Sequence, residues 1–338
     1  MLSKKEVSQI KEELENCQNP LFFFDDDADG LCSFLLLYRL VKEGHGVMVK
    51  TVPNLDARFL RKVEEYNPDK IFVTDVPIVE QEFIDGAKRK IIWIDHHPPV
   101  ERQGIFYFNP RKQKKDAYIP ATRLCYEVVK QDEWIAAVGC VGDGYLPDFP
   151  VGEWKDLEGK NVWDVMYTHP LGKLVQIFSF ILKGKTTDIN QSIRVLTRIK
   201  SPNEIINGET AQGKFILKRY EKIAQEYESL RDRAMKKAGK EKIFLFVYQE
   251  QENSFTSDLA GELLYRHPDK IVVVAREKGG ELKTSFRAKI AIEPAVQRAL
   301  VGVEGHGGGH EKACAAVVKK EDFERFMENF KRELEKDA

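Results

Sequence analysis

Short apolar segments dominate the first hundred residues and recur between stretches with helical spacing. They lie at 21–24 (LFFF), 47–52 (VMVKTV), 70–74 (KIFVT) and 90–94 (KIIWI). Helices are expected between them, over 31–43, 57–66 and 81–88. The apolar segments do not alternate with polar residues, which is typical of strands buried on both faces of a mostly parallel sheet. The sequence therefore predicts an α/β fold, with helices on both faces of an N-terminal sheet.

The rest of the chain divides into a helical stretch and a second mixed segment. Helical patterns run from 121 to 238, and the last carries one apolar stripe: Ile216, Tyr220, Ile223, Tyr227, Leu230 and Ala234. The stripe packs either within the chain or in a dimer interface. Strands are expected at 242–248, 270–275 and 284–287, a hairpin at 278–280, and helices at 257–265 and 321–336. We expect a domain at 1–205, a helical linker at 206–240 and a smaller α+β domain at 241–338.

Composition excludes several classes of protein. The 338 residues carry a net charge of −1, which excludes a broadly basic coat but leaves room for a local basic groove. The chain has no long apolar run and a charged N-terminus, so we expect no membrane span, no signal peptide and a cytoplasmic location. The five cysteines form no CxxC pair, which favours buried free thiols. Abundant Lys and Glu with few Met favour a thermophilic source.

Acidic and histidine side chains follow three of the predicted strands and one helix. In chain order they are Asp25, Asp26, Asp27, Asp29, Asp75, Asp95, His96, His97 and Asp143. Taken alone, each is more often a helix cap, a turn residue or a surface group. Parallel strands end at one edge of a sheet, so together these groups form a cluster that repels itself unless cations neutralise it. Oxygen and imidazole ligands suit Mn²⁺ or Mg²⁺, and two ions sharing a carboxylate suit phosphoryl transfer to water.

Six sequence motifs carry a family resemblance. DDDADG (25–30), TD (74–75), IDHHPP (94–99) and GDG (142–144) resemble, in this order, the motifs of the DHH phosphoesterase superfamily. GHGGGHEKACAA (305–316), with the predicted strand TSFRA (284–288), resembles the DHH-associated C-terminal domain. Asn109-Pro110 resembles the RecJ-like branch. The short archaeal RecJ-like single-strand exonucleases are the most similar group, and the nano-RNases are their nearest neighbours.

The resemblance implies roles for the N-terminal motifs. Two divalent ions, Mn²⁺ or Mg²⁺, are expected on Asp25, Asp27, Asp75, His96 and Asp143. Asp75 is expected to bridge the ions, and His97 to contact the scissile phosphate, which makes these two the catalytic candidates. Asp95 is expected to orient the neighbouring histidine. Asp29 is a further candidate ligand or a charge at a helix N-terminus, and Asp26 is expected to be a bystander.

One departure from the family pattern concerns the first motif. Many relatives carry a histidine shortly before it, where this chain has Leu21, Phe22 and Phe23. The ion nearest Asp25 is therefore expected to have fewer protein ligands or to recruit Asp29. We expect unequal affinities for the two ions.

The resemblance also implies a substrate-binding role for the C-terminal domain. The residues concerned are Ser285, Arg287, His306, Gly307, Gly308, Gly309 and His310. Glycines let backbone N–H groups approach a phosphate, and an arginine on a strand facing that loop can grip it bidentately. A plain glycine turn is the alternative. The basic segment RKQKK (111–115) is either a solvated loop or a contact for the phosphate backbone.

These inferences favour a metal-dependent exonuclease that degrades single-stranded RNA or DNA to mononucleotides, in the 3′→5′ direction, in DNA repair or RNA degradation. A phosphodiesterase of the nano-RNase kind, acting on short oligonucleotides, cyclic dinucleotides or small nucleotides, is the alternative. A non-catalytic replication scaffold resembling Cdc45 is disfavoured, because such a protein is expected to have lost the carboxylates that this chain retains. A replication or repair partner and the oligomeric state stay open.

Overall fold

The computed structural model describes residues 1–50 and 54–336, so residues 51 and 52 of the predicted strand 47–52 lie outside the described part. It divides into two compact units, Met1–Tyr220 and Glu221–Ala338, and the division falls inside one long helix. Each unit is described by itself below.

A parallel sheet forms the centre of the N-terminal unit. Its strand order is β2-β1-β4-β6-β7, and every neighbouring pair is parallel. The strands are β1 (Pro20–Asp25), β2 (His45–Val49), β4 (Lys70–Thr74), β6 (Lys90–Ile94) and β7 (Phe106–Phe108). A separate two-stranded sheet joins β3 (Asn54–Leu55) and β5 (Ile78–Val79). The predicted α/β fold with a parallel sheet is confirmed, with β7 as a strand that the sequence analysis did not predict.

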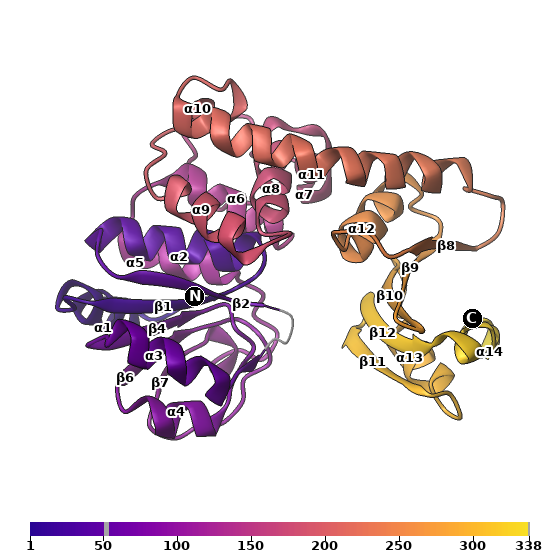
Figure 1. Ribbon diagram of the computed structural model, residues 1–338, viewed down its shortest axis with the longest axis horizontal. Coiled ribbons are helices and arrows are strands. Elements are labelled where there is room, and N and C mark those ends of the chain that lie inside the picture. Colours follow the sequence, from indigo (N-terminus) through magenta and orange to yellow (C-terminus); the bar gives the residue numbers. More distant parts are fainter. Residues whose placement is uncertain (51–53, 337–338) are drawn as a thin grey trace. The chain divides into compact units, whose positions relative to one another are not determined.

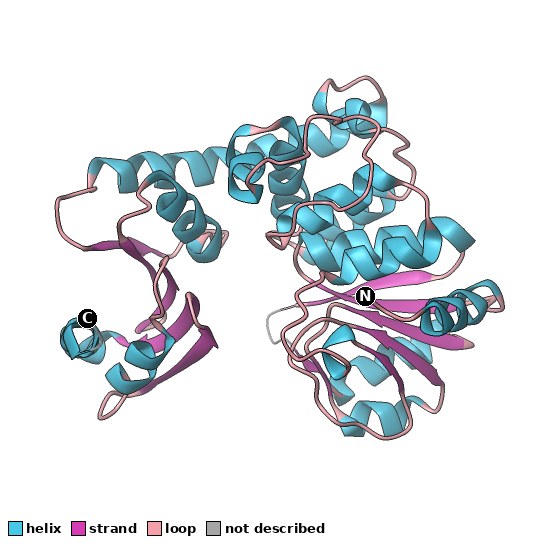
Figure 2. Cartoon of the chain, turned by 180° about the vertical axis from the view of Figure 1, so that it is seen from behind, coloured by secondary structure: helices cyan, strands magenta, loops and turns pink. Residues whose placement is uncertain are grey.

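Helices cover both faces of this sheet, as Figure 2 shows by the cyan helices above and below the magenta strands. One face carries α2 (Ala28–Val41) and α5 (Ala121–Val129), and the other carries α3 (Leu60–Tyr66) and α4 (Gln81–Ala87) (Figure 1). A further helix, α1 (Lys4–Glu15), contacts α5. Two short 3₁₀ helices lie at η1 (Ala57–Phe59) and η2 (Pro110–Lys112).

Alternate residues of β1 explain why both faces are covered. Phe22 and Phe24 pack on Phe34 of α2, with ring centroids 5.5 and 4.7 Å apart. Phe23 points to the other face and packs on Phe59 and Phe83, at 5.7 and 5.5 Å. All three β1 phenylalanines are fully buried. A strand with aromatic side chains on both faces needs a layer of helices on each face to bury them.

The turn from β1 into α2 depends on a close backbone approach. Asp27 is the N-cap of α2, and its side chain accepts a hydrogen bond from the Gly30 backbone N–H at 2.9 Å. A Cβ atom on Gly30 would lie 2.6 Å from the Asp25 carbonyl oxygen, so no other residue fits there without a shift. The helix begins three residues before the predicted start at residue 31, so Asp29 lies in its first turn rather than in a loop.

The remaining helices of this unit follow the predicted helical stretch. They are α6 (Glu133–Gly142), α7 (Val162–Thr168), α8 (Pro170–Ile181), α9 (Thr186–Leu196) and α10 (Pro202–Ile206). The long helix α11 (Ala211–Lys236) follows and carries the predicted apolar stripe. Tyr220 stacks on Phe180 of α8, and Tyr227 donates from its hydroxyl to Glu262, so both are buried by the chain itself. Packing within the chain, rather than a dimer interface, accounts for the stripe.

A second sheet organises the C-terminal unit, in the order β11-β12-β10-β9-β8. Only β8 and β9 are parallel, and the other pairs are antiparallel. The strands are β8 (Ile243–Gln249), β9 (Ile271–Lys278), β10 (Glu281–Arg287), β11 (Gly305–His310) and β12 (Ala313–Lys319). The helices are α12 (Thr256–Arg266), α13 (Glu293–Ala299) and α14 (Phe323–Lys336), with a 3₁₀ helix η3 (Lys320–Asp322). The predicted hairpin is present, with Gly279 and Gly280 at positive φ.

The glycine cluster is a strand and not the loop that the sequence suggested. Residues Gly305–His310 form β11, an edge strand paired with β12. A Cβ atom on Gly305, Gly307 or Gly309 would lie 2.6, 2.6 or 2.5 Å from a carbonyl oxygen of β12. The glycines are therefore required by the close approach of the two strands, which sequence spacing alone does not reveal.

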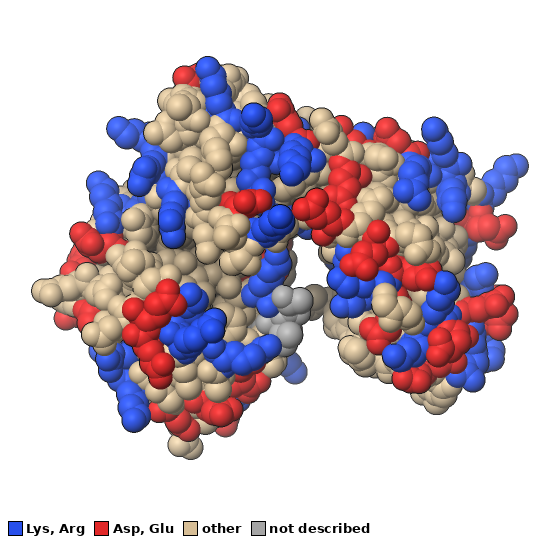
Figure 3. Space-filling view, in the orientation of Figure 1, with Lys and Arg blue, Asp and Glu red and all other residues tan. Residues whose placement is uncertain are grey.

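One expectation drawn from composition is confirmed by the structure. All five cysteines are free and buried. Within the described part of the chain, no helix is long and apolar enough to cross a membrane. Figure 3 shows basic and acidic side chains intermingled over each unit on the face in view, in keeping with the net charge of −1.

The double-sided burial of β1 leads to a prediction about stability. Phe23→Ala should lower the free energy of unfolding of the N-terminal unit by about 3–5 kcal/mol, because it leaves a cavity between the sheet and α4. The four tryptophans all lie in this unit, so guanidinium unfolding followed by tryptophan fluorescence reports on it alone. Phe106→Ala is the control, since Phe106 is 40% exposed and should cost less than about 1 kcal/mol. Equal losses for the two variants would contradict the packing described.

Candidate metal centre

The parallel sheet brings the acidic motifs to one edge. Asp25 ends β1, Asp75 follows β4, and Asp95, His96 and His97 follow β6. Because β1, β4 and β6 are parallel neighbours, their carboxyl ends lie side by side. Asp143 reaches the same place from the C-cap of α6. We call the set Asp25, Asp27, Asp29, Asp75, His96, His97 and Asp143 the acid–histidine centre.

Three overlapping groups within this centre have ligand atoms close enough to share an ion. They are Asp25–Asp27–Asp75, Asp75–His96–His97 and Asp29–His96–Asp143, and within each group the ligand atoms lie within 4.8 Å of one another. Asp75 belongs to two groups and His96 to two. A carboxylate shared between two groups is the arrangement that two neighbouring divalent ions need.

Several buried atoms of the centre lack a hydrogen-bond partner in the described part of the chain. They are Asp75 Oδ1, His96 Nδ1 and Asp143 Oδ2. His96 Nε2 lies 3.2 Å from Asp75 Oδ1, and His96 Nδ1 lies 3.7 Å from Asp143 Oδ2. Buried polar atoms are normally paired, so unpaired lone pairs that converge indicate a cation site. The donor set of carboxylate oxygens and imidazole nitrogen fits Mn²⁺ or Mg²⁺.

The electrostatics of the carboxylates support the same conclusion. Burial, followed by the charges of Asp29 and Asp27, raises the pKa of the Asp75 carboxyl well above its usual range. Burial and the same two charges also raise the pKa of Asp143. These groups resist ionisation together because like charges in a low dielectric repel. A bound cation reverses that effect, so the centre is suited to hold positive charge.

His96 is held in the form that binds metals. Only 6% of it is exposed, and burial, followed by the charge of His97, lowers the pKa of its ring to about 4. The ring is therefore neutral near pH 7 and keeps a lone pair available for a cation.

Asp75 occupies a strained backbone conformation. Its φ is 62°, in the left-handed region that non-glycine residues rarely adopt. Its N–H donates to the Ile94 carbonyl at 3.0 Å, and Trp93 Nε1 donates to the Val76 carbonyl at 2.9 Å. These bonds from β6 hold the turn, and strain of this kind is concentrated at functional sites.

A hydrogen-bond network fixes the second histidine of the DHH motif. Asp95 is fully buried and its Oδ1 lies 2.8 Å from His97 Nδ1. The other oxygen of Asp95 accepts from the Tyr107 hydroxyl at 3.0 Å and from Asn109 Nδ2 at 3.2 Å. Burial lowers the pKa of His97, but the hydrogen bond and charge of Asp95 outweigh it, so the pKa is raised. Asp95 thus orients His97 and stabilises its charged form.

Sequence reasoning missed part of this network. Asn109 was noted through the motif Asn109-Pro110, but Tyr107 was not, although it lies two residues earlier on the strand β7. Tyr107 also stacks on Trp93, with ring centroids 3.7 Å apart. Tyr118 was missed as well: its hydroxyl donates to the Asp143 carbonyl oxygen. No local pattern marks an isolated tyrosine of this kind.

Asp29 serves as a helix cap as well as a member of the centre. Its two carboxylate oxygens accept from the backbone N–H groups of Ala121 and Thr122, at 2.9 and 2.7 Å, at the start of α5. It shares a group with His96 and Asp143 and not with Asp25. The geometry therefore does not offer Asp29 as a substitute for the missing histidine beside Asp25. Asp26 is exposed and belongs to none of the groups found among the described residues.

The candidate residues of the C-terminal unit lie on neighbouring strands. Arg287 of β10, Ala313 of β12 and His310 of β11 occupy one row of the ladder. Ser285 and Gly308 occupy the row two residues away, on either side of Ala315. Arg287 does not face a loop, because β12 lies between it and the glycine strand. Its Nη2 donates to the Ser257 hydroxyl at 2.6 Å.

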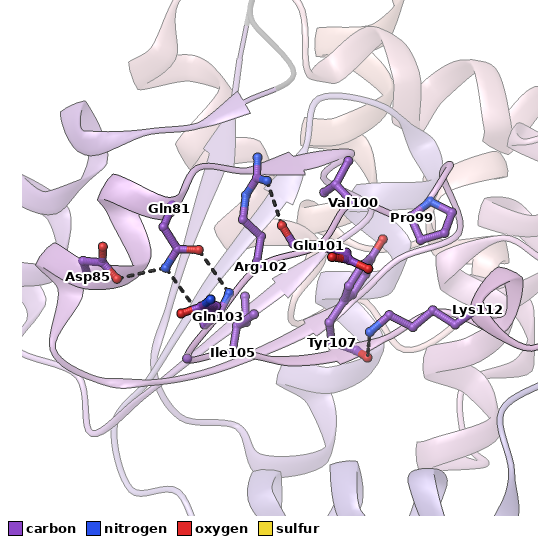
Figure 4. Close-up of a pocket in the computed structure, with 11 residues that line it drawn as sticks. Gln81, Asp85, Pro99, Val100, Glu101, Arg102, Gln103, Ile105, Tyr107 and Lys112 are labelled. Carbon is purple, nitrogen blue, oxygen red and sulfur yellow. Dashed lines mark hydrogen bonds between the residues drawn. The ribbon is translucent and has the colours of Figure 1, made fainter.

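A surface groove lies beside α4 and the 99–105 segment, with a volume of about 1120 Å³ (Figure 4). Its polar side chains are already hydrogen-bonded within the groove: Gln81 Nε2 donates to Asp85 Oδ1 and to the Gln103 carbonyl, and Lys112 Nζ donates to the Tyr107 carbonyl. Tyr107 is the only lining residue that also belongs to the network around Asp95. None of the predicted ligands lines the groove, so it is separate from the acid–histidine centre.

Comparisons with known families match both units. Residues 21–139 match the DHH family, N-terminal domain, and residues 239–336 match the DHHA1 domain. The two matches together cover most of the chain, which therefore belongs to the DHH phosphoesterase superfamily. Within that superfamily its fold is RecJ-like, as the solved structures show.

Three solved structures illustrate the likeness. RecJ from Thermus thermophilus, in complex with Mn²⁺, has a TM-score of 0.66 at 15% identity, over 96% of this chain and 53% of that one. An exonuclease RecJ bound to manganese has a TM-score of 0.60 at 14% identity, over 98% and 94%. A pGpG-specific phosphodiesterase from Vibrio cholerae has a TM-score of 0.51 at 15% identity, over 95% and 100%. The chain thus spans about half the length of the Thermus RecJ. No curated protein sequence matches the chain significantly.

The crowding of carboxylates leads to a second prediction. In metal-free protein, Asp75→Asn should raise the free energy of unfolding of the N-terminal unit by about 1–3 kcal/mol, because it removes one of several mutually repelling buried charges. Asparagine also tolerates the left-handed backbone at this position. Guanidinium unfolding in EDTA measures the change, with the exposed Asp85→Asn as a control within about 0.5 kcal/mol of wild type. A variant less stable than wild type under these conditions would overturn the electrostatic account.

Proposed function

We propose that the protein is a metal-dependent phosphodiesterase that hydrolyses single-stranded RNA or DNA by a two-ion mechanism. The observation that carries the proposal is the position of Asp75, whose carboxylate is shared by a group with Asp25 and Asp27 and a group with His96 and His97. Its unpaired, buried Oδ1 supports a bridging role.

The proposal divides the residues of the centre into metal ligands and a residue that binds the scissile phosphate. Asp25, Asp27 and Asp75 would hold one ion. We assign the other ion to Asp75, His96 and Asp143, because His96 shares one group with Asp75 and another with Asp143. Divalent ions in such a pair lower the pKa of water and neutralise charge on phosphoryl oxygens. His97, oriented and kept charged by Asp95, would donate a hydrogen bond to the scissile phosphate. Asp29 would act chiefly by fixing α5 and adding negative charge beside His96.

The C-terminal unit would bind the nucleotide to be released. Arg287 and His310 share a row of the ladder, and Ser285 lies two residues from Arg287. His306 and His310 are exposed on the glycine strand. We assign phosphate binding to Arg287, Ser285 and the strand residues His306, Gly307, Gly308, Gly309 and His310. In this proposal residues 1–205 carry the chemistry, 206–240 link the parts, and 241–338 bind substrate.

The comparisons leave two candidate substrate classes: longer single strands and very short oligonucleotides. RecJ structures carrying Mn²⁺ or Mg²⁺ support a metal-dependent nuclease as the first candidate. For this candidate we propose stepwise 3′→5′ release of mononucleotides from single strands, in DNA repair or RNA turnover in the cytoplasm. The Vibrio pGpG phosphodiesterase is matched over its whole length, which favours a second candidate, cleavage of very short oligonucleotides. The retained carboxylates argue against a non-catalytic scaffold.

An assay with end-labelled oligomers separates these candidates. RNA and DNA of two to about twenty nucleotides, labelled at either end, are incubated with Mn²⁺ or Mg²⁺. A ladder shortening from the 3′ end with mononucleotide products is the expected result. Turnover confined to di- and trinucleotides would instead support the second candidate.

Asp75→Asn is the matched control, because it removes one charge and keeps the shape of the side chain. It should lower kcat by about 10³-fold or more, since the position shared between the ions is lost. Comparable activity in this variant would remove the basis of the two-ion assignment.

The missing histidine leads to a prediction about metal binding. The Asp25–Asp27–Asp75 group offers only carboxylates, whereas the other groups include imidazole, which binds Mn²⁺ more readily. Calorimetric titration with Mn²⁺ should show two sites whose Kd values differ by roughly tenfold or more, about 1.4 kcal/mol. His96→Ala should abolish the tighter site, and the exposed His45→Ala should change neither. Two equally tight sites would contradict this prediction.

A further inference from the structure

The segment between Asn109 and Tyr118 is fastened at both ends to the acid–histidine centre. At its start, Asn109 Nδ2 donates to the His97 carbonyl at 3.0 Å. At its end, the Tyr118 hydroxyl donates to the Asp143 carbonyl, and the Tyr118 ring lies 5.9 Å from the ring of His96. The loop between these anchors, residues 110–117, therefore lies at the rim of the centre. We call it the rim loop.

Internal bonds hold the rim loop in one conformation. The Arg111 N–H donates to Asn109 Oδ1 at 2.9 Å, and Arg111 Nε donates to the Lys115 carbonyl at 2.9 Å. The Ala117 N–H donates to the Lys114 carbonyl at 2.9 Å. A loop bonded in this way presents its side chains in a fixed arrangement and loses little entropy when a ligand binds.

The rim loop is strongly basic, and most of its cations form no ion pair within the described residues. It carries four cations and one acid, Asp116. Lys112 is used structurally, because its Nζ lies 4.2 Å above the Tyr107 ring and donates to the Tyr107 carbonyl. Lys114 and Lys115 are exposed and Arg111 is half-buried. Within residues 1–50 and 54–336, no carboxylate lies at ion-pair distance from any of these three, although many surface cations of this chain are paired, such as Lys62 with Glu65.

A cluster of unpaired cations beside an acidic centre needs an explanation. The carboxylates of the centre would repel a polyanion, and bound ions offset that repulsion only at the scissile phosphate. Phosphates further along a strand need their own cations, and exposed Lys and Arg at a fixed position supply them. A dinucleotide has no internucleotide phosphate besides the scissile one to place there.

We propose that the rim loop, through Arg111, Lys114 and Lys115, binds backbone phosphates of a single-stranded polynucleotide next to the one being cleaved. The inference rests on the proposed function of the centre and deepens it, because it makes the N-terminal unit a selector of strands longer than a dinucleotide. Recognition of this kind is electrostatic and independent of base sequence.

The test compares two variants with the same change of charge. Lys114→Gln/Lys115→Gln removes two cations from the rim loop and spares Arg111, whose Nε bonds within the loop. Lys42→Gln/Lys88→Gln removes two exposed cations that follow α2 and α4 and precede the sheet strands, at the edge opposite the centre. Each protein is titrated with a fluorescent single strand of about 12 nucleotides in EDTA, by anisotropy, at several salt concentrations.

The rim variant should reduce the slope of log K against log salt by about 1.4, since each phosphate contact on a single strand contributes about 0.7. Its ratio of kcat/KM for this strand to kcat/KM for a dinucleotide should fall about tenfold, whereas the control variant should match wild type in both measurements. An unchanged slope, or an equal change in the control variant, would overturn the proposal. If wild type cleaves no phosphodiester at all, the proposed function fails, while the binding slopes still decide the role of the rim loop.

Discussion

Repulsion among buried carboxylates is the constraint on which the rest of this structure depends. Asp75 and Asp29 are each 1% exposed, and Asp143 lies close by with an unpaired oxygen. Such a group of anions is unfavourable in a low dielectric unless it is fully hydrogen-bonded or neutralised by cations. Some of its oxygens are bonded to the backbone, as those of Asp29 are at α5. Others converge without partners among the described residues, and those are the ones suited to metal.

The hydrophobic sheet stabilises the fold enough to tolerate this unfavourable arrangement. The aromatic residues of β1 are buried on both faces, and β4 and β6 are buried almost completely beside it. The rigid strands end at one edge, so the acidic turns that follow them cannot move apart. The left-handed backbone of Asp75 is held by a hydrogen bond to β6, so here too a rigid strand stabilises an unfavourable conformation at the site. The stability of the core offsets strain and repulsion at the site, as is usual for functional centres.

Two different sets of residues surround the centre: a hydrogen-bond network at His97 and the exposed cations of the rim loop. Asp95, Tyr107 and Asn109 form a hydrogen-bond network with His97 that fixes its orientation. The rim loop is hydrogen-bonded to the same histidine and, through Tyr118, to Asp143. It carries the cations that form no ion pair within the described residues. In the proposed function, the glycine strand of the C-terminal unit would supply a second set of phosphate-binding residues. A short acidic core with basic groups around it is a physically consistent way to bind both metal ions and a polyanion.

The sequence by itself determined that the sheet is parallel, the positions of four of its five strands and the identity of the metal-binding candidates. Uninterrupted apolar strands followed by acidic turns leave few alternatives, because parallel strands bring those turns to one edge. Only the tertiary structure decided that Asp29 caps α5 and joins His96 rather than Asp25, that Tyr107 supports Asp95, and that the glycine cluster is an edge strand. Each of these depends on contacts between segments far apart in the chain, which local patterns of hydrophobicity and turn chemistry do not encode.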